Sequence, residues 1–248
     1  MDRAVIFGRD AAAYDLARPG YPDEVVAHIL GYVDPGYMVE IGAGTGKATE
    51  KFADGRRRIT CLEPDPEMAG ILHAKGLPGV SVEGLRFEDW AAAESVDLFL
   101  AAQSWHWVDG SVGFVKAMKL LRPGGLIALL WNVPIDRYER FVDVYREHGP
   151  EILAEQDGRV FERDQKGWLS DLEEHGFAEC EVFSHPWSAR LDPAQFRRLC
   201  STYSDHMLIP EPRRTRLLDA LEAGVVSTGG WFDIEYEARV FTGRKYPG

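Results

Sequence analysis

The amino-acid composition is that of an ordinary folded protein. The chain has 248 residues, of which 45% are hydrophobic and 27% are charged, and this balance is typical of a globular domain. Its formal net charge is −12, whereas a nucleic-acid-binding protein presents a basic surface that neutralises phosphates. The longest basic run, Arg56–Arg58, is expected to lie in a solvated loop. We therefore expect no nucleic-acid partner.

Cysteine content and hydropathy indicate where the protein works. Cys61, Cys180 and Cys200 form no CxxC pair and are too few for a disulfide scaffold or a zinc site. This favours a reducing, cytoplasmic setting. The N-terminus lacks the long apolar core of a signal peptide. The richest apolar stretch, Leu126–Val133, is too short to span a bilayer, so we expect no membrane partner.

Short apolar runs alternate with helical patterns through the first half of the chain. The predicted strands are Met38–Ile41, Ile59–Leu62, Val80–Val82, Val96–Ala101 and Leu126–Trp131. The predicted helices lie near 46–54, 66–75 and 111–121, and Pro123–Gly125 is expected to break the last helix from its strand. Such alternation indicates a parallel sheet that is buried on both faces.

The second half of the chain adds two strands and longer helical stretches. Helices are predicted at 136–157, at 164–175 and at 193–222, the last interrupted by Pro210 and Pro212, and strands at Glu179–Phe183 and Glu235–Thr242. The predicted fold class is therefore α/β, a doubly wound and mostly parallel seven-stranded sheet with a helical cap. We expect one domain over 1–248, with an N-terminal helical cap at 1–36, a ligand-binding core at 37–133, and the rest of the sheet at 134–248 carrying cap insertions at 136–163 and 190–230.

A glycine-rich loop gives the sharpest functional signal. The run from Val39 to Thr49 follows a predicted strand, opens a helix and contains Gly42, Gly44 and Gly46. Glycines allow tight turns and close approach of a ligand, and the free N–H groups of a helix start face that ligand. The spacing fails the G-x-G-x-x-G dinucleotide pattern, because Lys47 holds the third position, and it fails the phosphate-binding P-loop pattern as well. The pattern that remains is E-x-G-x-G-x-G.

An acidic residue follows the second predicted strand. Glu63 stands where a carboxylate can accept hydrogen bonds from both hydroxyls of a ribose. The alternative is a solvated acid at the end of a strand, before Pro64. The glycine loop beside it favours the ribose.

Taken in order, these segments resemble class I S-adenosylmethionine-dependent methyltransferases, which have a Rossmann-like fold. The matching segments are Glu40–Gly46, Cys61–Asp65, Phe87–Trp90, Gln103–Trp107 and Leu121–Gly125. The N-terminal run Tyr14–Pro22 is similar to the small-molecule branch that includes relatives of trans-aconitate methyltransferase. The resemblance covers most of the chain and implies S-adenosylmethionine as the cofactor.

The resemblance also implies site residues. The glycine loop would pass the methionine part of the cofactor, and Glu63 would hold the ribose. The Phe87–Glu88 step would face the adenine. The family often has Asp-Ala at this step, whereas this chain has Arg86–Phe87, so a contact from the backbone is expected here. Arg18 would pair with the cofactor carboxylate, although a solvated arginine before a proline is the alternative. The residues implied to bind the cofactor are Tyr14, Arg18, Glu40, Gly42, Gly44, Gly46, Glu63, Phe87, Glu88, Ala102 and Gln103.

His106, between two tryptophans, is the candidate catalytic residue. It could be a general base, a wall of the acceptor pocket or a packed structural histidine. The other histidines show no metal-ligand spacing, so we expect no metal. Methyl transfer is a direct displacement that depends mainly on positioning, and a base is needed only for an acceptor that carries a proton.

The expected substrate is a small molecule methylated on an oxygen, with carboxyl methylation included. The sequence leaves the oligomeric state open. Two other functions also stay open: a nucleotide-dependent oxidoreductase, and a non-catalytic protein that binds the same cofactor.

Overall fold

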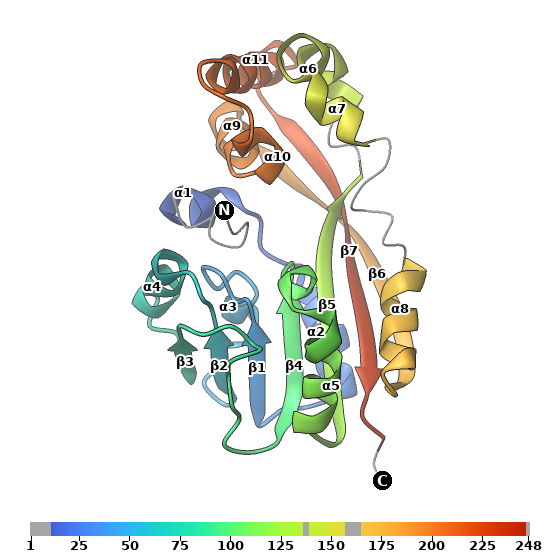
Figure 1. Cartoon of the computed structure of the whole chain (residues 1–248). Helices are drawn as coiled ribbons and strands as arrows, with labels where there is room; N and C mark the ends of the chain where they lie inside the picture. The colour runs from blue at the N-terminus through green and yellow to red at the C-terminus, as the bar shows by residue number, and fades with distance from the viewer. Residues whose placement is uncertain (1–10, 136–138, 157–164, 247–248) are drawn as a thin grey trace. The chain divides into compact units, whose positions relative to one another are not determined.

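The computed structural model describes residues 11–135, 139–156 and 165–246. They form an α/β fold around a seven-stranded sheet (Figure 1). In chain order the strands are β1 (Tyr37–Ile41), β2 (Arg58–Leu62), β3 (Val80–Glu83), β4 (Val96–Ala102), β5 (Leu121–Pro134), β6 (Ala178–Leu191) and β7 (Phe232–Arg244). The predicted fold class is confirmed.

The strand order is β3-β2-β1-β4-β5-β7-β6. Strands β3, β2, β1, β4 and β5 are mutually parallel. The N–H of Gly124 donates to the carbonyl of Lys245, and that of Ile135 donates to the carbonyl of Glu235. Residue numbers thus rise along β5 and fall along β7, which is the antiparallel arrangement. The order reverses between β1 and β4, and ligands of open α/β sheets bind at such a switch point, outside the carboxyl ends of the strands.

The helices follow the predicted pattern with shorter pieces in the C-terminal half. Those of the first half are α1 (Ala11–Ala17), α2 (Asp23–Tyr32), α3 (Thr49–Phe52), α4 (Pro66–Ala74) and α5 (Gly110–Leu120), with a 3₁₀ turn, η3, at Trp105–Trp107. Those of the second half are η4 (Glu139–Phe141), α6 (Val142–His148), α7 (Pro150–Gln156), α8 (Gln165–Glu174), α9 (Pro193–Ser201), α10 (Ser204–Met207) and α11 (Arg213–Ser227).

The parallel strands are covered on both faces. Successive side chains of a strand point to opposite faces, and Val39, Phe99 and Ile127 share one core cluster with Phe114 of α5 and Leu172 of α8. On the opposite face the alternating residues are just as deeply buried: Met38, Leu98, Leu100, Leu126, Ala128 and Leu130. In Figure 1 helix α5 lies in front of the sheet and α2 behind it. Burial on both faces explains why these strands are short continuous apolar runs.

Three expectations about elements need correction. The helix predicted over 46–54 is reduced to α3, because the glycine loop continues to Ala48. The helical stretch 193–222 is divided into α9, α10 and α11, which extends to Ser227. The break expected at Pro123–Gly125 is wrong, because backbone hydrogen bonds to Lys245 hold this segment inside β5.

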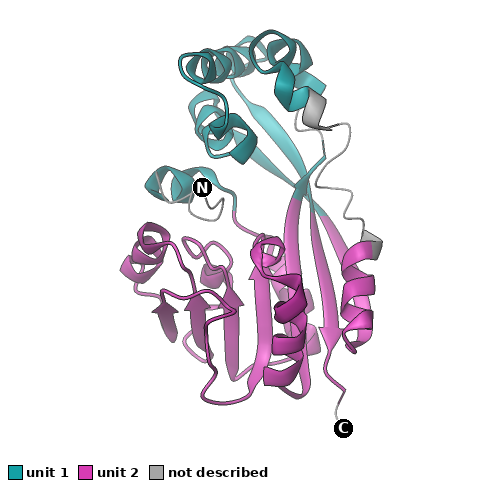
Figure 2. Ribbon diagram, viewed as in Figure 1, with its two compact units in different colours: residues 1–19, 133–162, 186–237 teal, residues 20–132, 163–185, 238–248 magenta. Residues whose placement is uncertain are grey.

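The chain divides into two compact units (Figure 2). Unit 1 comprises 1–19, 133–162 and 186–237, and unit 2 comprises 20–132, 163–185 and 238–248. The predicted N-terminal cap, 1–36, is thus shared, with α1 in unit 1 and α2 in unit 2. The predicted cap insertion at 136–163 includes α6 and α7, which belong to unit 1. Its residues 136–138 and 157–163 lie outside the described residues, as do residues 1–10 of the predicted N-terminal cap.

Unit 1 has an aromatic core of its own. The rings of Phe141, Phe196 and Phe232 lie with centroids 4.7–5.2 Å apart. His206 is fully buried in the same unit, with Nε2 3.1 Å from the hydroxyl of Tyr145 and Nδ1 2.7 Å from a carboxylate oxygen of Asp205. Buried polar groups need such partners. In the described part of the chain, no helix is long and apolar enough to cross a membrane.

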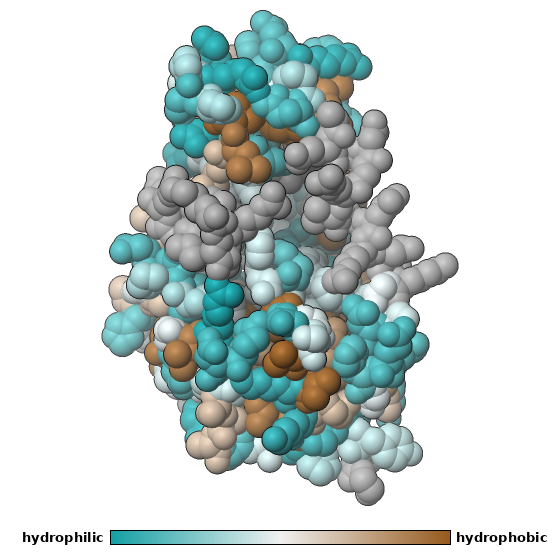
Figure 3. Space-filling model, viewed as in Figure 1, coloured by the Kyte–Doolittle hydropathy of each residue, from teal (hydrophilic) through white to brown (hydrophobic). Residues whose placement is uncertain are grey.

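The basic run Arg56–Arg58 differs from the expected solvated loop. Arg57 is buried, and its guanidinium donates to the carboxylates of Asp54 at 2.5 Å and Asp34 at 3.1 Å. The run is therefore partly neutralised by its own neighbours. The face seen in Figure 3 is largely hydrophilic, with hydrophobic surface over α5, where Val112 and Val115 are exposed.

Candidate functional site

The glycine loop connects β1 to α3 and has three residues in the left-handed region, Gly42 at φ +65°, Gly44 at +57° and Gly46 at +88°. A Cβ at Gly42 would lie 2.6 Å from the Cβ of Ser104, and one at Gly46 would lie 2.3 Å from a methyl carbon of Leu72. Those two glycines are therefore needed for packing. For a Cβ at Gly44, the sulfur of Met68 would be the only atom of the described residues within 4 Å, at 3.9 Å, apart from the adjacent residues of the chain. Gly44 thus presents the open side of the loop.

Glu63 holds the loop in place. Its side chain is 6% exposed, and its two carboxylate oxygens accept the N–H of Gly44 at 2.8 Å and the N–H of Asp65 at 2.9 Å. Burial raises the pKa of this carboxyl above its ordinary value, and the two N–H donors oppose the rise. Each carboxylate oxygen has a second lone pair. The group can therefore accept two further hydrogen bonds, as a pair of ribose hydroxyls would require.

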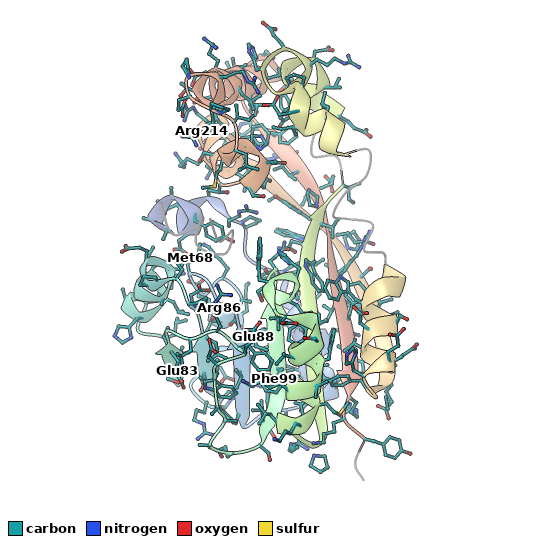
Figure 4. All side chains as sticks on the ribbon, in the orientation of Figure 1. Met68, Glu83, Arg86, Glu88, Phe99 and Arg214 are labelled. Atoms are coloured by element: carbon teal, nitrogen blue, oxygen red, sulfur yellow. The ribbon has the colours of Figure 1, made fainter. Side chains whose placement is uncertain are left out.

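Asp65 and Met68 belong to the same site, and the sequence interpretation missed both. The carboxylate of Asp65 accepts the N–H groups of Glu67 and Met68 at 3.0 and 3.1 Å, which caps the start of α4. This cap positions Met68, which is buried and whose sulfur would lie 3.9 Å from a Cβ at Gly44. Met68 is labelled in Figure 4. The signal was present in the sequence, since an aspartate directly before Pro66 is typical of a helix start.

Thr45 was also missed. Its side chain is 1% exposed, and its hydroxyl is buried without a hydrogen-bond partner among the described residues. Leaving such a group unpaired costs about 1–3 kcal/mol. A buried, unpaired hydroxyl in the glycine loop is accounted for by a polar ligand that the loop holds.

Glu40 lies beneath the loop. It is 1% exposed, and its carboxyl accepts the hydroxyl of Thr49 at 2.6 Å. Burial is the main cause that raises the pKa of Glu40 to about 8, and the nearby Glu63 adds to the rise. Glu40, which is predicted to bind the cofactor, is therefore buried and largely protonated at neutral pH.

The end of β4 carries Ala102 and Gln103. Gln103 has a φ of +60°, uncommon for a residue other than glycine. Its amide nitrogen donates to the carbonyl of Asn132 at 3.0 Å, and the side chain of Asn132 donates to the carbonyl of Gly20 at 3.0 Å. These bonds join the ends of β4 and β5 to the segment before α2. Asn132 is a further residue that sequence patterns did not single out.

His106 lies in η3, directly after β4. The residue is exposed beside Trp107, with the two ring centroids 4.7 Å apart. The surrounding protein nevertheless desolvates the imidazole and lowers its pKa to about 4. At neutral pH the ring is therefore uncharged. Trp105, by contrast, is buried in the core.

The Phe87–Glu88 step is held against α5. The ring of Phe87 is 2% exposed and packs on Phe99 and Trp105, so it lies in the core and leaves only its backbone for a ligand. The ammonium of Lys116 donates to the carbonyls of Phe87 and Glu88 at 2.6 and 2.8 Å. Glu88 in turn accepts the N–H of Asp109 at 2.8 Å. Figure 4 labels Glu83 at the end of β3, and Arg86 and Glu88 in the segment that follows this strand.

Tyr14 and Arg18 belong to unit 1. The guanidinium of Arg18 lies 5.1 Å from the ring centre of Tyr14 and 4.8 Å from that of Tyr203. One N–H group donates to the carbonyl of Thr202 at 2.8 Å, while Nε is buried without a partner among the described residues. The structure thus places this pair within unit 1, and the remaining predicted site residues within unit 2.

Comparison with known proteins decides the family. The protein-family model of the methyltransferase domain matches residues 39–129 of this chain. An uncharacterised methyltransferase of Mycobacterium tuberculosis is 32% identical over 218 residues, which cover 88% of this chain and 84% of that protein. The chain belongs to the class I S-adenosylmethionine-dependent methyltransferases. An uncharacterised methyltransferase-like protein of Schizosaccharomyces pombe is also similar, with 27% identity over 97% of this chain and 96% of its own.

Solved structures share the fold of this methyltransferase. A protein of Anaeromyxobacter dehalogenans assigned to the type II methyltransferases aligns with a TM-score of 0.69 at 21% identity, over 93% of this chain and 99% of that one. An S-adenosylmethionine-dependent methyltransferase from Thiobacillus denitrificans, solved with S-adenosylhomocysteine, aligns with a TM-score of 0.55 at 13% identity, over 97% and 99% of the two chains.

The residues present fit the cofactor. Gly44 has open space in front of it, Glu63 has lone pairs to spare, and the hydroxyl of Thr45 is buried without a partner. All three lie at the switch point of the sheet, within unit 2. The enzyme is therefore an S-adenosylmethionine-dependent methyltransferase. In the described part of the chain, no cluster of three or more His, Cys, Asp or Glu side chains is placed to hold a metal ion.

Proposed function

We propose that this methyltransferase acts on a small molecule and transfers the methyl group to an oxygen that is already ionised at neutral pH, with a carboxylate favoured. The observation that carries the proposal is His106, an exposed residue in η3 whose imidazole is uncharged at neutral pH, because desolvation lowers its pKa to about 4. Glu63 and the glycine loop belong to the same compact unit. The proposal agrees with the resemblance of the N-terminal run Tyr14–Pro22 to relatives of trans-aconitate methyltransferase, a small-molecule branch.

The low basicity of His106 separates acceptor classes. A phenol has a pKa near 10, far above the lowered pKa of His106, so moving its proton to this imidazole is strongly uphill. His106 is therefore a poor base for such an acceptor. A carboxylic acid has a pKa of about 4 and is ionised without help. His106 then acts as a neutral wall of the acceptor site.

When bound, S-adenosylmethionine supplies a methyl group that its sulfonium has already activated. The chain's own residues then have to bind and orient. Glu63 is proposed to hold the ribose, Gln103 and Ala102 to border the amino group, and the backbone at Phe87 and Glu88 to meet the adenine. Arg18, a cation without a carboxylate partner among the described residues, is proposed to pair with the carboxylate of the cofactor.

The chemistry of the acceptor is testable with labelled S-adenosylmethionine and a panel of small carboxylic acids, phenols and amines. The labelled products are then treated with mild base. A methyl ester hydrolyses and releases volatile labelled methanol, whereas methyl ethers and N-methyl groups stay attached. We expect label transfer mainly to carboxylic acids and its release by base.

The variant His106→Asn keeps a neutral polar wall but cannot act as a base. It should retain most of the transfer to a carboxylic acid. The matched negative control is Glu63→Ala, which should weaken cofactor binding. Base-stable label on a phenol or an amine, with transfer abolished in His106→Asn, would show that the acceptor class is wrong.

A further inference from the structure

Glu40 is a buried carboxyl without a cationic partner among the residues that the structure describes. It is the fourth residue of β1, two residues before Gly42, and its side chain is 1% exposed. The hydroxyl of Thr49, which is itself fully buried, donates to it at 2.6 Å. In the described part of the chain no lysine, arginine or histidine forms an ion pair with it. An isolated carboxylate in such a place is costly, so the group stays neutral until a positive charge arrives.

The neighbours of Glu40 reinforce that state. Glu63, at the end of β2, opposes its ionisation by like charge. Cys61 faces it from the paired position of β2, and the Cys61 thiol has its pKa raised by burial and by Glu40. Leu100 holds the paired position on β4. The one group that favours the carboxylate is the hydroxyl of Thr49, and with the pKa of Glu40 at about 8 the carboxyl keeps its proton at neutral pH.

The cofactor brings the missing charge. S-adenosylmethionine carries a sulfonium, and S-adenosylhomocysteine, the product, does not. We propose that Glu40 is a specificity-determining residue: its carboxyl releases a proton to solvent when S-adenosylmethionine binds, and the resulting carboxylate favours this cationic cofactor over S-adenosylhomocysteine. The position of Glu40, buried under the glycine loop within the same compact unit, supports this role. In low-dielectric surroundings, the attraction between a carboxylate and the sulfonium of S-adenosylmethionine is stronger than it is in water.

A purely structural role makes a different prediction. If Glu40 only accepts the hydrogen bond of Thr49, a glutamine accepts it equally well. Glu40→Gln would then bind both ligands as the parent does. If Glu40 must ionise, Glu40→Gln loses the preference for S-adenosylmethionine while keeping the fold. The inference does not depend on the identity of the acceptor.

The decisive experiment is calorimetry of each ligand in two buffers that differ in ionisation enthalpy, which gives the number of protons released on binding. For the parent at neutral pH we expect close to one proton for S-adenosylmethionine and much less for S-adenosylhomocysteine. Glu40→Gln should abolish the release and weaken S-adenosylmethionine by about tenfold, the effect of one pKa unit. Its affinity for S-adenosylhomocysteine should stay within about twofold. The control is Glu50→Gln, an exposed neighbour on α3 that pairs with Lys75.

A second measurement uses the parent alone, so it stands even if the variant does not fold. The ratio of the two affinities should rise with pH toward the pKa of about 8 and level off above it, because the carboxyl then no longer has to be deprotonated. A ratio that does not change with pH, or a proton release that persists in Glu40→Gln, would overturn the proposal.

Discussion

Removing the carboxylate of Glu63 tests the proposed ribose contact most directly. In the structure one carboxylate oxygen accepts the N–H of Gly44 and the other accepts that of Asp65, so each oxygen has one lone pair left for a ribose hydroxyl. Hydrogen bonds to a charged group contribute about 1.5–3 kcal/mol. We expect Glu63→Ala to weaken S-adenosylhomocysteine by that amount, which is roughly 10- to 150-fold in affinity.

Calorimetry with two ligands separates the possible causes. Adenosine shares the ribose and lacks the amino-acid end, so its affinity should fall in parallel with that of S-adenosylhomocysteine. The control variant is Glu67→Ala, because Glu67 is an exposed acid on the first turn of α4, four residues after Glu63. Its effect on binding should be small.

The variant must also be shown to be folded. Removing the carboxylate leaves the N–H groups of Gly44 and Asp65 without their acceptors, and unpaired buried donors are costly. Thermal unfolding should therefore accompany the calorimetry. A loss of affinity below a few tenths of a kcal/mol in a folded variant would refute the contact. A loss confined to S-adenosylhomocysteine would assign Glu63 to the amino-acid end of the ligand instead.

Three more predictions concern the loop, the base and the cap. Gly44→Val should abolish cofactor binding by calorimetry, whereas Gly76→Val, with the same φ of +57° in open space, carries the same backbone strain and should bind normally. His106→Ala should lower turnover with little change in S-adenosylhomocysteine affinity. The activity of the parent enzyme should fall in acid only near pH 4, where the imidazole protonates. A fall in activity near pH 6.5 would contradict the lowered pKa of His106. Hydrogen exchange should slow in residues 11–21 and 190–230 when S-adenosylhomocysteine and the acceptor are present. A response confined to the glycine loop would contradict the prediction that these segments form a cap.

The sheet and the glycine loop could be predicted from the sequence because their signals are local. A parallel strand buried on both faces has to be a short apolar run, as at Val96–Ala101, and a left-handed backbone favours glycine, as at Gly44. The order of these signals along the chain was enough to indicate the class of enzyme.

The state of individual side chains depended on residues far away in the chain. Arg18 donates to the carbonyl of Thr202, 184 residues later, so its neighbours are not evident from Tyr14–Pro22. The ring of Phe87 is in the core because Phe99 and Trp105 pack on it, although its position in the motif suggested a ligand contact.

Ionisation was decided by the tertiary structure alone. The motif E-x-G-x-G-x-G does not say whether its glutamate is paired with a cation. In the folded protein, burial and the nearby Glu63 keep Glu40 neutral at pH 7, although the hydrogen bond from Thr49 favours the carboxylate. The same holds for His106, whose pKa depends on the protein packed around the ring. Sequence patterns specify backbone geometry because it is set by neighbouring residues, whereas desolvation is set by everything within several ångströms in space.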